Sequence, residues 1–110
     1  MREITMTELM NVTLTKAANI YFDGNVTSRK VTLADGSTKT LGIMMPGEYT
    51  FATAEKELME IMTGDVEILL PNEKNWQSIS GGEQFYVDAN ATFDIKVKSI
   101  TDYCCSYISS

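Results

Sequence analysis

Turn-forming residues recur along this chain at such short intervals that the segments between them leave little room for a helix. The turn signals are Asp23-Gly24, Asp35-Gly36, Pro46-Gly47, Gly64-Asp65, Pro71-Asn72, Gly81-Gly82 and Asp88 to Asn90. The runs between them are short and rich in Val, Ile, Thr, Tyr and Phe. Because this pattern is typical of a sandwich or barrel of strands, an all-β fold is predicted.

Individual strands are visible in the alternation of apolar and polar residues. Residues 93–97 alternate with a period of two and have one charged face, and residues 66–70 do so less cleanly. Residues 31–44 hold two apolar runs around a turn, which predicts a hairpin. Residues 1–11 leave three alternatives open, namely a short helix, an added edge strand or a frayed tail.

The length and the apolar runs of the chain restrict its class. With 110 residues it can form one domain with a single core. Its longest apolar runs, such as residues 68–70, are far too short to span a membrane. Residues 1–10 contain no uninterrupted hydrophobic stretch and no small-residue cleavage site. We therefore expect a cytoplasmic protein without a membrane partner.

The charge of the chain argues against one class of partner. The formal net charge is −6, from 9 basic and 15 acidic residues, and the basic residues are dispersed along the sequence. Binding to a nucleic-acid duplex depends on clustered Lys and Arg that neutralise phosphates, so polymeric nucleic acid is not an expected partner. A small anion is still compatible, because one or two local cations or a ring of backbone amides can hold a phosphate.

The cysteines and the methionines of the chain are predicted to contribute to its interior. Cys104 and Cys105 are adjacent, so on a strand their side chains would point to opposite faces. A disulfide between neighbours is strained, and two reduced thiols, one of them in the core, are predicted. A central group of methionines, namely Met44, Met45, Met59 and Met62, is predicted to fill the core, to line a ligand cavity, or to do both.

The segment from Gly47 to Gly64 keeps the spacing of a metal-cupin motif but lacks the metal ligands of that motif. The pattern runs Gly, a short gap, His, any residue, His, three or four residues, Glu, six residues, Gly. Glu57 stands six residues before Gly64, and the two histidine positions counted back from it are Phe51 and Thr53. Neither a phenyl ring nor a hydroxyl is a useful ligand for a divalent transition metal, and the chain contains no histidine.

A second cupin frame begins at Gly82 and loses its ligand in the same way. Counting along this frame places Asp88 at its proline, Asn90 at its turn glycine and Phe93 at its histidine. Asn90 is chemically sensible there, because Asn tolerates the left-handed backbone almost as well as Gly. The two frames together predict a single cupin, or jelly-roll, β-barrel that holds no metal.

Beyond these frames, many residues of the chain match the pattern of one family. They are Tyr21-Phe22-x-Gly24-x-Val26-x-Ser28, Gly42-x-Met44-x-x-Gly47-Glu48-Tyr49-Thr50-Phe51-x-Thr53-x-Glu55, Met59, Gly64, Leu70-Pro71, Trp76, Gly82, Phe85-x-Val87, Phe93 and Tyr103-x-Cys105-x-Tyr107. In these residues the chain resembles the small bacterial pyrimidine/purine nucleoside phosphorylase family. Residues 19–110 are accordingly expected to form the domain, and residues 1–18 an N-terminal extension. Asp88 departs from the pattern, since many members have Pro there.

The resemblance implies more than the residues alone can show. It implies a single-domain cupin barrel that works as a homodimer without a metal or another cofactor. It also implies an enzyme, a pentosyltransferase, that splits purine and pyrimidine nucleosides with inorganic phosphate into a free base and a pentose 1-phosphate. Composition and spacing by themselves lead only to the metal-free barrel.

Phosphorolysis of an N-glycosidic bond passes through a cation-like sugar, so the site should hold phosphate, exclude water and stabilise charge on the departing base. The rings expected to stack on a base or sugar are Tyr49, Phe51 and Phe93. The groups expected to carry the chemistry are Glu55 and Glu57, toward ribose hydroxyls or the developing charge, and Thr53, as a donor to phosphate. Arg29 is the first choice for a phosphate-binding cation, because its planar fork suits phosphate.

Strand geometry decides which of these side chains can share a cavity. On one strand Tyr49, Phe51, Thr53 and Glu55 face the same way, whereas Glu57 reaches the cavity only if the strand bends or ends before it. An ordinary structural interpretation is also open, in which the rings are core residues only, the carboxylates lie in a solvated turn and the arginine is a surface charge.

Two other functions are compatible with a barrel of this kind. The first is a non-enzymatic metal-free cupin that binds a small metabolite. The second is a metal enzyme that uses carboxylates alone, which the absence of histidine in the sequence makes a poor choice. Phosphate-dependent release of a free base from a nucleoside distinguishes the phosphorylase from the binding protein.

Overall fold

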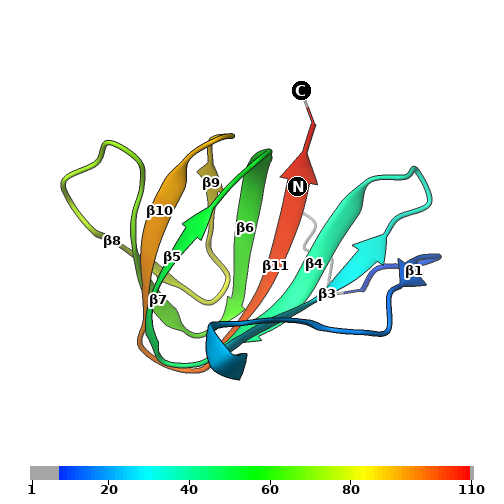
Figure 1. Cartoon of the computed structure of the whole chain (residues 1–110), viewed down its shortest axis with the longest axis horizontal. Helices are drawn as coiled ribbons and strands as arrows, with labels where there is room; N and C mark the ends of the chain where they lie inside the picture. The colour runs from blue at the N-terminus through cyan, green and yellow to red at the C-terminus, as the bar shows by residue number, and fades with distance from the viewer. Residues whose placement is uncertain (1–7, 110) are drawn as a thin grey trace.

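The computed structural model of the chain describes residues 8–109, and within that range it consists almost entirely of β-strands (Figure 1). In chain order the strands are β1 (Thr13–Leu14), β2 (Asn19–Tyr21), β3 (Val26–Thr32), β4 (Thr38–Met44), β5 (Gly47–Ala52), β6 (Lys56–Thr63), β7 (Asp65–Leu69), β8 (Gln77–Ser80), β9 (Gln84–Val87), β10 (Thr92–Val97) and β11 (Thr101–Ile108). A single 3-10 turn, η1 (Phe22–Gly24), is the helical part of the described chain. The predicted all-β class is confirmed.

The strands form two antiparallel sheets, here called sheet A and sheet B. Sheet A has the order β1-β3-β4-β11-β6-β9, with β2 also paired to β3, and sheet B has the order β5-β10-β7-β8. Figure 1 shows β7, β8 and β10 at the left and β3 and β4 at the right. Among the described strands no pairing joins sheet A to sheet B. Closure into a single jelly-roll barrel therefore stays a prediction.

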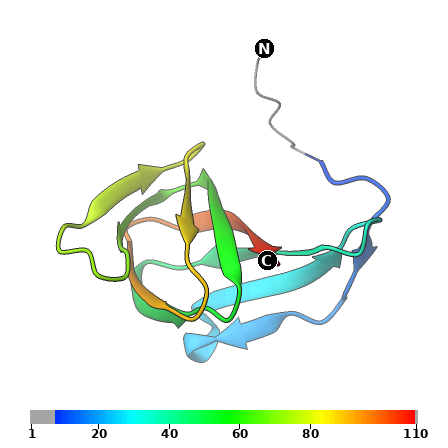
Figure 2. The ribbon, with the colours of Figure 1, turned by 90° about the horizontal axis from the view of Figure 1, so that it is seen from above.

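The two sheets turn their apolar faces toward each other and share one core. Viewed from above, the ribbon encloses an interior between them (Figure 2). The core residues of sheet A are Val26, Met44, Met59, Ile61, Phe85, Val87, Tyr103 and Cys105, and those of sheet B are Tyr49, Val66, Ile68, Ile79, Phe93, Ile95 and Val97. They occupy alternate strand positions, because side chains at i and i+2 point to the same face.

The local predictions for the strands hold where the turn chemistry is strong. The predicted hairpin is β3–β4, and in its turn the carboxylate of Asp35 accepts hydrogen bonds from the backbone and the hydroxyl of Ser37, at 2.9 and 2.6 Å. The hydroxyl bond first, and then the backbone bond, lower the pKa of the Asp35 carboxyl. Asn90 adopts φ 54°, the left-handed conformation expected of it.

The N-terminal segment is described only in part. The expectation for residues 1–11 falls largely on residues 1–7, which lie outside the described range. Thr13 and Leu14 form a short edge strand that pairs with Thr32 and Val31 of β3. None of residues 8–109 lies in a helix that is long and apolar enough to cross a membrane.

Candidate functional site

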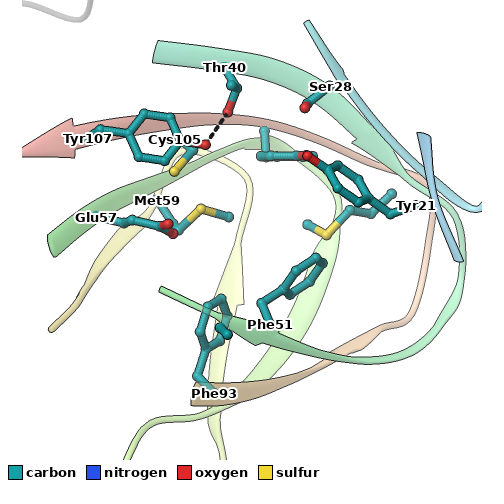
Figure 3. Close-up of a pocket in the computed structure, with 12 residues that line it drawn as sticks. Tyr21, Ser28, Thr40, Phe51, Glu57, Met59, Phe93, Cys105 and Tyr107 are labelled. Atoms are coloured by element: carbon teal, nitrogen blue, oxygen red, sulfur yellow. Dashed lines mark hydrogen bonds between the residues drawn. The ribbon is translucent and has the colours of Figure 1, made fainter. Parts of the chain in front are cut away.

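A cavity of about 170 Å³ opens between β5 and β10 of sheet B and the inner face of sheet A (Figure 3). Its lining residues are Tyr21, Ser28, Thr40, Met44, Phe51, Ala52, Glu57, Met59, Phe93, Tyr103, Cys105 and Tyr107. Phenyl rings form one side of this pocket, and hydroxyl, thiol and carboxyl groups form the other (Figure 3). The pocket is thus amphipathic across its width, which suits a ligand with a flat apolar part and a hydroxylated part.

The apolar wall is a continuous group of aromatic rings. The ring centroids of Phe51 and Phe93 lie 5.7 Å apart with their planes tilted by 31°. Phe93 also meets Phe85 of sheet A edge-on at 5.9 Å, and Phe51 meets Phe22 of η1 edge-on at 5.6 Å. Such offset and edge-to-face pairs are favourable arrangements of the ring quadrupoles. The wall is therefore held rigidly by contacts behind it.

The polar wall comes from strands that pair within sheet A. Thr40 of β4 is opposite Cys105 of β11, and Tyr107 of β11 is opposite Glu57 of β6. The hydroxyls of Thr40 and Tyr107 hydrogen-bond to each other at 3.2 Å (Figure 3). Ser28 lies on the inner face of β3, the strand beside β4, and its hydroxyl accepts a hydrogen bond from the Asn19 side-chain amide at 3.2 Å. The donors and acceptors of this wall are thereby oriented before any ligand binds.

Glu57 is the acidic member of the pocket. Burial raises the pKa of its carboxyl, the Cys105 thiol acts in the opposite sense as a hydrogen-bond donor, and the Glu55 carboxylate raises the pKa further. Burial also raises the pKa of Cys105, Tyr103 and Tyr107. These three groups are therefore neutral donors near pH 7, and Glu57 is the acidic residue of the lining, with a carboxyl pKa above its ordinary value.

The structure brings three of the sequence-predicted site residues together in this pocket: Phe51, Phe93 and Glu57. Tyr49 lies on the same face of β5 as Phe51, as strand alternation predicts, but it is buried behind the wall, where its hydroxyl donates to the carbonyl of Met45 at 2.7 Å. β5 ends at Ala52 and β6 begins at Lys56. That break is the bend that Glu57 needs to reach the cavity.

The remaining predicted residues lie outside the pocket lining. Glu55 is exposed in the turn between β5 and β6, close enough to Glu57 to act on its pKa. Arg29 is exposed, one position from inward-facing Ser28 and hence on the opposite face of β3. Its Nε donates to the carbonyl of Lys16 at 3.0 Å.

Thr53 is buried, and its hydrogen bonds go to the protein. Its hydroxyl donates to the carbonyl of Asp88 at 2.6 Å and accepts from the backbone N–H of Ala91 at 3.1 Å. Its backbone N–H also donates to the carbonyl of Ala91 at 2.8 Å. Thr53 therefore fastens the turn before β10, the strand that carries Phe93.

Replacing Thr53 by valine is expected to destabilise the protein by about 1–3 kcal/mol, because the Asp88 carbonyl and the Ala91 N–H lose their hydrogen-bond partner at a part-buried site. The control is Thr50→Val, since the Thr50 hydroxyl also makes a 2.6 Å bond, to the Asp94 carboxylate, but at an exposed site where water can replace it. That variant is expected to lose less than about 1 kcal/mol. Urea denaturation measures both, and equal losses would contradict the structural role of Thr53.

Sequence reasoning missed the polar wall. Tyr103, Cys105 and Tyr107 stand at alternate positions of the last strand, a period-two signal that places them on one face. Nothing in the sequence identifies the strands that pair with β11, and Thr40 lies 67 residues before Tyr107. As predicted, the two cysteines are free, and Cys105 faces the pocket while Cys104 occupies the other face.

The acidic and thiol groups of residues 8–109 form no group of three or more His, Cys, Asp or Glu side chains with the proximity of metal ligands. Cys104, on the outer face, has its pKa raised to about 11 by burial and by the neighbouring Glu60 carboxylate. It is therefore a protonated thiol near neutral pH, and thiolate is the form that binds metals.

Known proteins that resemble this chain were found by sequence. A family model described as pyrimidine/purine nucleoside phosphorylase matches residues 16–107. A protein of that name from Colwellia psychrerythraea is 62% identical over 104 residues, which cover 94% of this chain and 100% of the relative. A protein of the same name from Sulfurimonas denitrificans is 60% identical over 103 residues, which cover 94% of this chain and 99% of the relative.

Solved structures with the same fold were also found. A protein of unknown function from Acinetobacter sp. ADP1, with the family designation DUF1255, is 33% identical and superposes with a TM-score of 0.89 over 92% of this chain and 98% of its own. The EutQ protein of Clostridium difficile is 13% identical, with a TM-score of 0.61 over 74% of this chain and 67% of its own. At that identity the second likeness extends to the fold alone.

Proposed function

We propose that this chain, which belongs to the pyrimidine/purine nucleoside phosphorylase family, splits both purine and pyrimidine nucleosides with inorganic phosphate into a free base and a pentose 1-phosphate. The observation that carries the proposal, beside the family, is the pocket with rings on one side and hydroxyls with one carboxyl on the other. Those two sides match the two parts of a nucleoside, a flat base and a hydroxylated sugar.

The base would lie against Phe51 and Phe93. Stacking contributes about 1–3 kcal/mol per base and depends little on which base is stacked, because every base has a π-face. A wall of phenyl rings, without amide or guanidinium groups in contact with the base edge, therefore suits both purines and pyrimidines. This supports a broad specificity.

The ribose and the phosphate would lie against the polar wall of Ser28, Thr40 and Tyr107, whose hydroxyls can both donate and accept. The cavity is smaller than the roughly 300–1,000 Å³ of typical small-molecule sites, so part of the ligand must extend through the open mouth. Arg29 and Glu55 are exposed outside the lining and would make no contact with the substrate.

The reaction is tested by incubating the purified protein with uridine and, separately, adenosine, with and without phosphate, and separating the products by chromatography. Free base and pentose 1-phosphate are expected, and their formation should depend on phosphate. Added chelator is expected to leave the rate unchanged, since the proposed mechanism uses organic groups only. Absence of turnover with every nucleoside, together with tight binding of another metabolite, would favour the non-enzymatic binding protein.

We further propose that the protein is a cytoplasmic homodimer that associates through the outer face of sheet A. Three large apolar side chains of that face are exposed, Leu41 by 40%, Ile43 by 38% and Tyr86 by 51%. They lie on β4 and β9, at positions that alternate with inward-facing residues. Light scattering is expected to give twice the mass of the chain, and Leu41→Lys is expected to shift it toward the monomer. A monomeric wild-type protein would overturn this assignment.

A further inference from the structure

The charge inside the pocket conflicts with the charge of the co-substrate that the proposed function requires. Glu57 is the lining residue with an acidic side chain, and the described residues of the lining include no Lys or Arg. Phosphate brings one or two negative charges. Two like charges in a partly buried site disfavour each other, and the ordinary solution is that one of them takes up a proton.

The groups around Glu57 offer no other way to relieve the repulsion between its carboxylate and phosphate. The lining residues around it are the neutral groups Thr40, Cys105 and Tyr107 of sheet A and the rings of Phe51 and Phe93 of sheet B. Outside the lining, the Glu55 carboxylate is close enough to raise the Glu57 pKa, and the exposed Lys30 of β3 pairs with Thr40 of β4. Lys56, the neighbour of Glu57 in sequence, points to the opposite face, with Nζ 5.0 Å from the centroid of the Tyr86 ring. The charged group that acts on Glu57 is therefore the Glu55 carboxylate, and the described lining holds no cation.

We propose that Glu57 is protonated when phosphate is bound and donates that proton to the departing base, so that it is the catalytic acid of the reaction. The inference rests on the proposed phosphorolysis and names the group that performs its proton transfer. The position of the carboxyl supports it, because Glu57 lies in the same pocket as the rings that would hold the base (Figure 3). Its raised pKa agrees with this role but does not by itself establish it.

The proton balance of the reaction closes without another base. An oxygen of the hydrogen phosphate dianion forms the bond to C1′ of the sugar while the C1′–N bond breaks and its electron pair goes to the base. The Glu57 carboxyl gives its proton to the base, which leaves neutral. The pentose 1-phosphate, formed as a monoanion that still holds the proton of the phosphate, returns that proton to the Glu57 carboxylate.

The test compares Glu57→Gln with Glu48→Gln, because both variants remove one carboxylate and only the first lies in the pocket, whereas Glu48 is exposed on β5 outside the lining. Glu57→Gln is expected to lower kcat by about 100-fold or more, the lower end of what general acid catalysis contributes. Glu48→Gln is expected to keep the wild-type rate. Glu57→Asp retains an acid and is expected to recover part of the activity, which a purely structural role would not predict.

The pH dependence gives a second test. Because the protonated form is the active one, kcat/KM of the wild type is expected to fall as pH rises through the pKa of Glu57 in the free enzyme. Glu48→Gln should keep that decline, and Glu57→Gln should lack it. Thermal unfolding of each variant establishes that it is folded under the assay conditions.

A binding measurement tests the coupling between anion binding and protonation of Glu57 separately from catalysis. Sulfate is a dianion that does not titrate in the relevant range, so calorimetry with sulfate reports the protonation of the protein alone. Its affinity for the wild type is expected to weaken with rising pH, and its affinity for Glu57→Gln should be independent of pH. Equal pH dependence in both proteins would overturn this coupling.

The outcomes distinguish this inference from the function on which it rests. If the wild type releases base with phosphate and Glu57→Gln retains its rate, the acid role is wrong and the phosphorylase remains. If the wild type releases no base from any nucleoside, the proposed function fails and the acid role fails with it.

Discussion

Phe51→Ala is expected to lower kcat/KM for nucleosides by about 10- to 100-fold, which is the loss of one stacking partner worth about 1–3 kcal/mol. The Phe51 ring is only partly buried and borders the pocket, so a base can reach its face. The loss should be similar for adenosine and uridine, because stacking does not depend on the hydrogen-bonding pattern of the base. Initial rates at several nucleoside concentrations measure the effect.

Phe93→Ala is the comparison that shows whether the loss arises at the ligand. Phe93 also lines the pocket but is only 3% exposed, and its ring contacts both Phe51 and Phe85. Its truncation is expected to cost about 3–5 kcal/mol of stability, the range for a buried phenylalanine. Phe51→Ala should cost clearly less and remain folded in the assay. A folded Phe51→Ala protein with the wild-type kcat/KM would show that the base does not lie on this ring.

The apolar wall of the site could be predicted from the sequence because it depends on local geometry. Alternation along one strand places Tyr49 and Phe51 on the same face, and in the structure Tyr49 belongs to the buried core while the partly buried Phe51 packs against it. The cupin spacing places Phe93 with them, and the observed register pairs Phe93 directly with Phe51. A motif that fixes the positions of two paired strands is therefore enough to predict the apolar wall.

The polar wall could not be predicted, because it depends on pairings that no local pattern encodes. β11 pairs with β4 on one side and β6 on the other, and this brings Thr40, Glu57 and Tyr107 to neighbouring positions from three separate parts of the sequence. Thr53 shows a related limit. Strand alternation correctly predicts that the Thr53 side chain points inward. It cannot tell whether the hydroxyl faces a ligand or the backbone of a neighbouring turn.

Gly42→Ala is expected to destabilise the protein by about 3 kcal/mol or more, the upper part of the range for a side chain forced into a packed site. Gly42 lies in β4 between Ser28 of β3 and Tyr103 of β11. A Cβ at this position would overlap the carbonyl oxygen of Thr27 and approach the Tyr103 hydroxyl to 2.9 Å. One of the groups in contact is backbone, which cannot rotate away, so the strands themselves must separate.

Gly42→Ala should also disturb the site, because the Tyr103 side chain passes across β4 at Gly42, where no side chain is in its way. The Tyr103 hydroxyl donates to the carbonyl of Thr27 at 3.2 Å, two strands away from its own backbone. This bond ties β3 to β11 and so sets the distance between Ser28 and the hydroxyls of the polar wall. An added methyl group removes it. Activity should therefore fall even at temperatures where the Gly42→Ala protein is still folded.

Gly81→Ala provides a graded control for this argument. A Cβ at Gly81 would lie 3.1 Å from the carbonyl oxygen of Met62, a contact that a small shift relieves. The expected loss is about 1 kcal/mol, the lower end of the overpacking range, with no effect on turnover. For a domain of this size each kcal/mol shifts Tm by roughly 4–8 °C, so calorimetry separates the two variants clearly. A Gly42→Ala protein as stable as Gly81→Ala would mean that β3 and β4 can separate freely, and the register that places Ser28 and Thr40 in the pocket would then not be rigid.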